Sequence, residues 1–195
     1  MKLVIMTKST FFVEEDKILT TLFDEGMDNL HLFKPGSTPL YAERLLSLIP
    51  EDYYRKITVH DHFYLKNEYD LAGIHLDSAD TEIPNNYKGK IGRTCTDIQL
   101  LKEMKKKSSC VFLKNIFDCI EFSEEKKTFT QQQLEDAADK GLIDRHVYAL
   151  GGMSLDNIRM AKTLGFGGVV ICGDLWSRFD IHNQTDFKEH IAHFE

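Results

Sequence analysis

Two short apolar runs near the end of the chain, each closed by glycine, constrain this sequence more than any other feature. They are residues 147–150, followed by Gly151 and Gly152, and residues 168–171, followed by Cys172 and Gly173. An amphipathic stretch separates them, so the order reads as strand, tight turn, helix, strand and tight turn. Glycine leaves room for an anion beside the backbone, toward which the amides of the turn and of a helix start point. If the turns are neighbours, they predict a phosphate site, although tight turns also use glycine for structural reasons alone.

Six further short segments precede this pair and read as strands, the first of them a continuous apolar run. They occupy residues 3–6, 30–34, 57–61, 73–76, 90–95 and 110–113. Helical patterns separate the runs, and this alternation indicates a parallel sheet. We therefore expect a single α/β domain, residues 1–195, folded as a small (β/α)8 TIM barrel with a short C-terminal helix at about 184–193. An open doubly wound sheet is the alternative, and the weakest helical stretch is at residues 83–87.

Composition limits the ligand and the setting. The chain has 195 residues, 42% of them hydrophobic, which is enough for one sizeable core. Its 24 basic residues are outnumbered by 31 acidic ones, which argues against nucleic acid as a partner and favours a small molecule. The four cysteines show no disulfide spacing, and no apolar run reaches membrane-spanning length. We expect a cytoplasmic protein with reduced cysteines and no membrane partner, and the sequence leaves a homo-oligomer open.

Polar residues cluster where the predicted strands end. In a TIM barrel the reactive groups lie at the C-terminal ends of the strands. Those ends carry His31 and Lys34, His60 to His62, His75 and Asp77 to Asp80, Arg93 to Thr96, and Lys114, Asn115 and Asp118. We expect the active site among these residues.

Asp61 and Asp80 follow two neighbouring strands and are the candidates for a metal site. Adjacent carboxylates repel unless a cation lies between them, and Mg²⁺ binds through one or two carboxylates together with substrate phosphate oxygens. The alternative, which spacing alone favours, is that each aspartate caps the helix after it. A zinc site at His60 and His62 is a weaker interpretation, because residue 61 points to the opposite face of a strand from residues 60 and 62.

Five motifs together resemble the family of thiamine phosphate synthases and the related thiazole tautomerases over nearly the whole chain. Val59-His-Asp-His resembles the family's Asn-Asp-Arg motif, and Gly73-Ile-His-Leu-Asp-Ser-Ala-Asp resembles Gly-Val-His-Leu-Gly-Gln-x-Asp. Gly92-Arg-Thr-Cys-Thr resembles Gly-x-Ser-x-His, while Ala149-Leu-Gly-Gly-Met and Gly168-Val-Val-Ile-Cys-Gly resemble the motifs of the last two strands.

The resemblance implies a barrel enzyme that joins a pyrimidine methyl diphosphate to a thiazole phosphate and releases diphosphate. It implies that Asp61 and Asp80 hold Mg²⁺, which with cationic side chains would stabilise the departing diphosphate. The positions implied for binding the substrates are His31, His60, Thr94, Thr96, Cys119, Gly151, Gly152, Cys172 and Gly173. The candidates for catalysis are Lys34, Thr94 and Lys114.

Several positions depart from the family pattern. Phe33, Pro35 and Phe122 stand where the family has cationic residues. We expect Lys34 to turn into the barrel mouth and compensate, with Lys114 or Arg93. The titratable histidine of tautomerases is Thr96 here, and threonine cannot exchange protons near neutral pH.

Three hypotheses therefore stand beside one another. The first is a synthase whose activity is weakened by the lost cations. The second is a proton-transfer enzyme acting on a phosphorylated thiazole, with His31 or His60 as base. The third is a protein that binds the phosphorylated ligand without turnover.

Overall fold

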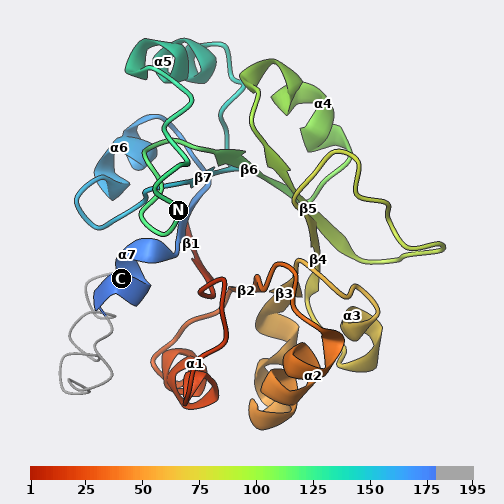
Figure 1. The fold of residues 1–195 in the computed structure, drawn as a ribbon. Coiled ribbons are helices and arrows are strands. Elements are labelled where there is room, and N and C mark those ends of the chain that lie inside the picture. Colours follow the sequence, from red (N-terminus) through yellow and green to blue (C-terminus); the bar gives the residue numbers. More distant parts are fainter. Residues whose placement is uncertain (179–195) are drawn as a thin grey trace.

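The computed structural model describes residues 1–178, and Figure 1 shows its strands arranged around a central axis. All neighbouring strands are parallel, and β8 pairs with β1, so the eight-stranded barrel is closed. The strands are β1 (Lys2–Met6), β2 (Leu30–Leu32), β3 (Ile57–Val59), β4 (Gly73–Leu76), β5 (Lys90–Cys95), β6 (Cys110–Lys114), β7 (Val147–Leu150) and β8 (Gly168–Ile171). The predicted single-domain TIM barrel is confirmed.

The helices lie outside the ring of strands (Figure 1). They are α1 (Glu15–Asp24), α2 (Pro39–Leu48), α3 (Leu65–Glu68), α4 (Leu101–Lys106), α5 (Gln131–Asp139), α6 (Ile158–Thr163) and α7 (Gly173–Arg178), with 3-10 turns η1 (Glu51–Lys56) and η2 (Ile98–Leu100). Local sequence explains their ends: Gly26 follows α1 with a φ of 107°, which L side chains rarely adopt. A reciprocal capping box between Thr130 and Gln133 begins α5.

The structure differs from the sequence expectations in three places. Residues 77–89, between β4 and β5, contain no helix, because Pro84 interrupts them and nearly all their side chains are exposed. The second and third strands end at Leu32 and Val59, earlier than expected. The predicted helix at about 184–193 lies outside the described residues.

The barrel separates two packing regions. Most buried apolar side chains, such as Leu19, Leu46 and Leu134, belong to the large cluster that joins strands and helices. A second, smaller cluster consists of Val4, Met6, Phe112, Tyr148 and Val170. Their alternation along β1, β6, β7 and β8 places these residues inside the barrel. The other strands contribute His31, His60, His75 and Thr94, all of them buried.

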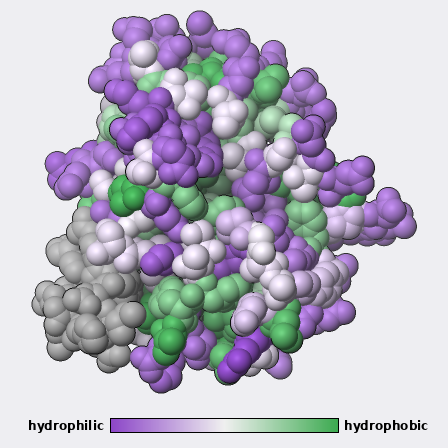
Figure 2. All heavy atoms as spheres, in the orientation of Figure 1, coloured by the Kyte–Doolittle hydropathy of each residue, from purple (hydrophilic) through white to green (hydrophobic). Residues whose placement is uncertain are grey.

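The outer surface is mixed. Figure 2 shows hydrophilic residues over most of one face and hydrophobic residues along its lower edge, in the region of α1 and α2. Helix α2 buries Leu45 and Leu46 but leaves Leu40 and Leu48 largely exposed. No helix within residues 1–178 is long and apolar enough to cross a membrane.

Candidate active site

A cavity of about 190 Å³ lies at the C-terminal ends of the strands and is lined by both glycine turns. Its predicted lining residues are Thr94, Lys114, Cys119, Gly151, Gly152, Cys172 and Gly173. Met6, Phe33, Leu150 and Val170 add apolar walls. The structure therefore brings the two turns to one pocket, as a shared phosphate site requires.

The glycines permit a close approach of the loop that follows β6. Gly151 and Gly152 have φ values of 99° and 59°. A Cβ atom on Gly152 would lie 2.3 Å from the Asp118 carbonyl oxygen, and one on Gly173 would lie 2.7 Å from Cβ of Ile120. Within residues 1–178, no acceptor is assigned to the backbone N–H of Gly152 or Gly173. These amides are thus available to an anion, and the glycines serve packing as well.

Asp77 forms a polar wall of the same pocket. Its Oδ2 accepts a hydrogen bond from His60 Nδ1 at 2.8 Å, and its Oδ1 accepts one from Thr94 Oγ1 at 3.3 Å. Because an ionised carboxylate only accepts hydrogen bonds, both partners must donate. Asp77 is therefore held in place from two sides, with its carboxylate at the cavity.

Two further imidazoles extend this network into the barrel. His31 Nδ1 lies 2.9 Å from His60 Nε2, and His75 Nε2 lies 2.9 Å from Thr94 Oγ1. Since His60 Nδ1 and the Thr94 hydroxyl donate to Asp77, His31 and His75 donate to His60 and Thr94. Burial lowers the pKa of both His31 and His75 well below the ordinary value, with the neighbouring His60 acting in the same direction. Both rings are therefore neutral donors, and neither lines the pocket.

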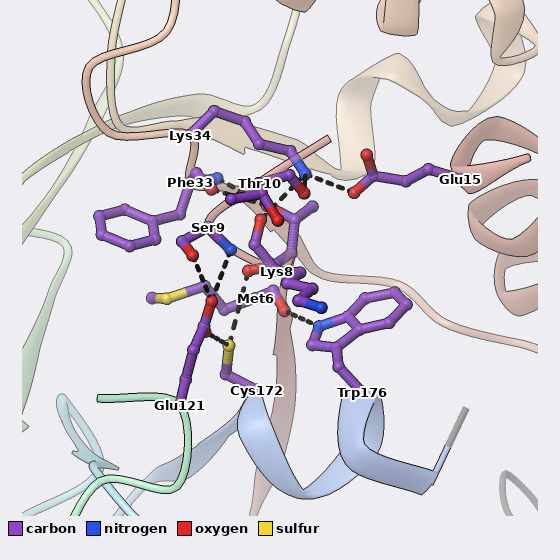
Figure 3. A network of polar contacts seen from close by, with 11 residues as sticks. Met6, Lys8, Ser9, Thr10, Glu15, Phe33, Lys34, Glu121, Cys172 and Trp176 are labelled. Carbon is purple, nitrogen blue, oxygen red and sulfur yellow. Dashed lines mark hydrogen bonds and ion pairs between the residues drawn. The ribbon is translucent and has the colours of Figure 1, made fainter. Parts of the chain in front are cut away.

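Lys34 is not where the sequence led us to expect it. Its ammonium, 2% exposed, pairs with the Glu15 carboxylate at 2.5 Å and donates to the carbonyl oxygens of Lys8 and Thr10 (Figure 3). Burial lowers the pKa of Lys34 and raises that of Glu15. Phe33 lines the pocket instead. Lys34 thus anchors the loop after β1 and does not line the pocket.

The remaining charges leave the pocket acidic. Lys114 lines it but pairs with Glu125 at 2.7 Å, while Arg93 is not among the lining residues. Glu121 also lines the pocket; it accepts hydrogen bonds from the Ser9 amide, the Ser9 hydroxyl and the Cys172 thiol (Figure 3). The lining thus has three carboxylates, those of Asp77, Glu121 and Glu125, and one ammonium group. A diphosphate would need added positive charge here.

The cysteines of the pocket differ from reactive thiols. Burial raises the pKa of Cys172, and the Glu121 carboxylate acts in the same direction, so Cys172 stays a neutral donor. Cys119 accepts a long hydrogen bond, 3.5 Å, from the Phe122 amide. Thr96, by contrast, is exposed and lines a separate cavity beside Asp97, so it is not brought to the pocket.

Asp61 and Asp80 differ in their fit to a cation. Asp61 is partly buried and its Oδ2 has no partner; burial raises its pKa, and the Asp77 carboxylate acts in the same direction. A buried carboxylate oxygen without a donor fits a metal ligand. Asp80 is exposed, and neither aspartate caps a helix, since Tyr64 is the N-cap of α3 and residues 81–89 hold no helix. Asp61 fits Mg²⁺ as it stands, whereas Asp80 is exposed and fits only as a second ligand that joins when the ion binds.

The sequence pointed to the strand ends but gave Asp77 no role. The signal was the period of two in Gly73, His75 and Asp77, which places all three on one face of β4 and its extension. The resemblance obscured it, because the family motif has glycine where this chain has Asp77.

Solved structures place the chain among known proteins. It matches the crystal structure of thiamine phosphate pyrophosphorylase from Bacteroides thetaiotaomicron with 44% identity and a TM-score of 0.87, over 100% of this chain and 94% of that chain. Thiamine phosphate pyrophosphorylase from Pyrococcus furiosus matches with 18% identity and a TM-score of 0.70, over 97% and 94%. A mutant tryptophan synthase alpha-subunit from the same organism, with 14% identity, a TM-score of 0.66 and coverage of 97% and 93%, shares the fold.

No family model and no curated protein matches the sequence. The full-length match at 44% identity nevertheless decides the relationship, since the strands and both glycine turns lie within it. The chain belongs to the thiamine phosphate pyrophosphorylase family.

Proposed function

We propose that this protein binds a thiazole phosphate through the amides of the two glycine turns and joins it to a pyrimidine methyl diphosphate. The observation that carries the proposal is the convergence of Gly152 and Gly173 on one cavity, in a chain 44% identical to a thiamine phosphate pyrophosphorylase. The apolar walls suit a flat heterocycle, and the free amides suit a phosphate group.

The chain's own groups divide the work of this reaction. The amides of Gly152 and Gly173 orient the thiazole phosphate, and Lys114 exchanges its Glu125 partner for the departing diphosphate. Asp61, joined by Asp80, would hold Mg²⁺ beside the cavity, whose lining contains neither residue; when bound, the ion would supply the positive charge that the acidic pocket lacks. Met6 and Val170 exclude water from the reacting atoms. Since two of the three lost cations have no substitute in the pocket, we expect a slow enzyme.

Turnover with purified protein, both substrates and Mg²⁺ tests this proposal. We expect thiamine phosphate to form, and its absence at high enzyme concentration removes the synthase claim. Thermal stabilisation by thiazole phosphate, measured in parallel, reports binding by itself, because a ligand of the folded state stabilises by mass action. Stabilisation without turnover identifies a binding protein that lacks the chemistry.

A proton-transfer reaction on a phosphorylated heterocycle is the second candidate, and the position of Asp77 favours it. The carboxylate faces the pocket, while His31 and His60, the bases suggested by sequence, lie buried behind it. Asp77 would take the proton, and His60 would hold the carboxylate in place. Asp77→Asn should then lower tautomerisation by about 10²-fold or more, the usual contribution of a general base. The matched control is Asp139→Asn, an exposed aspartate at the end of α5 that has no role in the site; equal losses in the two variants contradict the assignment.

A further inference from the structure

Three buried imidazoles meet inside the barrel on neighbouring strands. His31 lies on β2, His60 directly follows β3 and His75 lies on β4, and they are 3%, 4% and 0% exposed. One ring nitrogen from each lies within 4.8 Å of the others. Histidine is only intermediate in its tendency to be buried, so three buried imidazoles in contact form a distinct chemical group.

The outer nitrogens of two rings are already held as they are in metal sites. His60 Nδ1 donates to the Asp77 carboxylate and His75 Nε2 donates to the Thr94 hydroxyl. A metal-bound histidine generally donates its other N–H to a carboxylate or another oxygen, which fixes the ring and raises its basicity. The remaining nitrogens then carry lone pairs: His60 Nε2 accepts from His31 Nδ1, and His75 Nδ1 has no partner.

Two of the imidazole nitrogens have a spacing that suits a shared ion. His31 Nδ1 and His60 Nε2 are 2.9 Å apart. Two nitrogens about 2.0–2.1 Å from one ion, at roughly a right angle, are separated by a similar distance. His75 Nδ1 is buried without a partner, an unsatisfied acceptor that a cation would satisfy.

A second cavity gives access from the opposite end of the barrel. It has a volume of about 310 Å³ and is lined by His31, Gly73 and Gly92. A Cβ atom at residue 92 would lie 2.3 Å from His75 Nδ1, so glycine there opens the interior to this imidazole. The His75 ring stacks on His60 with centroids 4.4 Å apart, so binding of an ion by His75 requires its ring to turn out of this stack.

We propose that His31, His60 and His75 bind one divalent transition-metal ion of borderline softness, such as zinc or cobalt. The proton of His31 moves from Nδ1 to Nε2, which frees the third lone pair without net loss of a proton. Three imidazole nitrogens suit zinc, cobalt and nickel and suit Mg²⁺ poorly, because Mg²⁺ prefers oxygen ligands. The three ligands are distinct from Asp61, and the site shares the Asp77 carboxylate with the pocket of the proposed reaction.

Titration of the full, chelator-treated protein with ZnCl2, followed by calorimetry, tests the proposal. We expect one high-affinity ion per chain, and with CoCl2 a visible d–d absorption of a low-symmetry nitrogen site. The informative variants are His31→Gln and His60→Asn, because each removes an imidazole ligand and keeps a polar side chain of similar size. Each should weaken zinc binding by at least about a hundredfold, and Asp77→Asn by about tenfold to a hundredfold.

Two controls separate this site from adventitious binding. His146→Gln removes an exposed imidazole, and His190→Gln combined with His193→Gln removes a pair outside the described residues. Both should bind zinc as the unmodified protein does. Circular dichroism melting checks that His31→Gln and His60→Asn remain folded. No zinc uptake at 100-fold excess of metal, or unchanged affinity in folded His31→Gln and His60→Asn, overturns the proposal.

Discussion

The two halves of the barrel interior have the same backbone alternation but opposite chemistry. The half built by β6, β7, β8 and β1 is filled by Phe112, Tyr148, Val170, Val4 and Met6. The half built by β2 to β5 holds His31, His60, His75 and Thr94. The apolar half ends in the glycine turns with free amides, and the imidazole half ends in the Asp77 carboxylate. A ligand in the pocket therefore meets an anion site on one side and a hydrogen-bond acceptor on the other.

Lys34 and Lys114 allow the two halves to be tested separately. Lys34 follows β2 in the imidazole half, and Lys114 ends β6 in the apolar half. Replacing Lys34 by Met should produce the largest loss of stability, about 3–5 kcal/mol in the free energy of unfolding, because Glu15 is left buried and unpaired. Denaturant unfolding measures the loss. Replacing both Lys34 and Glu15 by apolar residues should recover part of the lost stability. A Lys34→Met protein with normal stability but no activity would contradict this structural role and support the catalytic role predicted from sequence.

Gly152→Ala should test the apolar half, with a smaller expected loss of about 1–3 kcal/mol in unfolding free energy. The new methyl group meets the Asp118 carbonyl, and the backbone has a positive φ that alanine disfavours. The same variant should also abolish stabilisation by thiazole phosphate. Gly141→Ala is the matched control, because Gly141 has a similar φ of 68° with nothing within 4 Å of the added Cβ.

A fall in pH should lower the free energy of unfolding through the imidazole half of the barrel interior. Folding holds the pKa of His31 and His75 below 6.5, so below that pH the unfolded chain takes up protons that the folded chain does not. Their contribution to stability is therefore complete above about pH 6.5 and declines as the pH falls, by up to about 1.4 kcal/mol per pH unit for each imidazole. Urea unfolding of the metal-free protein between pH 7 and 5 measures this slope, and His31→Gln should flatten it.

The smallest effect is expected for Lys114→Met. Lys114 is partly exposed and already forms an ion pair with Glu125. Its loss should therefore weaken diphosphate binding by about tenfold, with little change in the free energy of unfolding. Competition binding with diphosphate and Mg²⁺ measures it. Lys126→Met, which removes an exposed lysine of the same loop, should leave the affinity unchanged, and a similar loss there would indicate a general charge effect.

Much of the fold was predictable because its signals are local. Apolar runs, glycine stops and helical spacing identified the eight strands and most of the helices, including α1, α2 and α5. The stretch at 83–87 failed as a helix because Pro84 interrupts it and Ile83 remains exposed. The site was partly predictable, because both glycine turns line one pocket as expected. Thr96, however, lines a separate cavity, and of the two predicted metal ligands Asp61 is partly buried while Asp80 is exposed.

The sequence by itself determined the strand order, the glycine turns and the family, because strand periodicity and the freedom of glycine act over a few residues. Only the tertiary structure decided that Phe33 enters the pocket while Lys34 pairs with Glu15, and that three imidazoles from separate strands converge behind Asp77. The physical reason is that a buried charge or imidazole is stabilised by partners that are distant in sequence. Only the packing of the whole chain brings these partners within hydrogen-bonding distance.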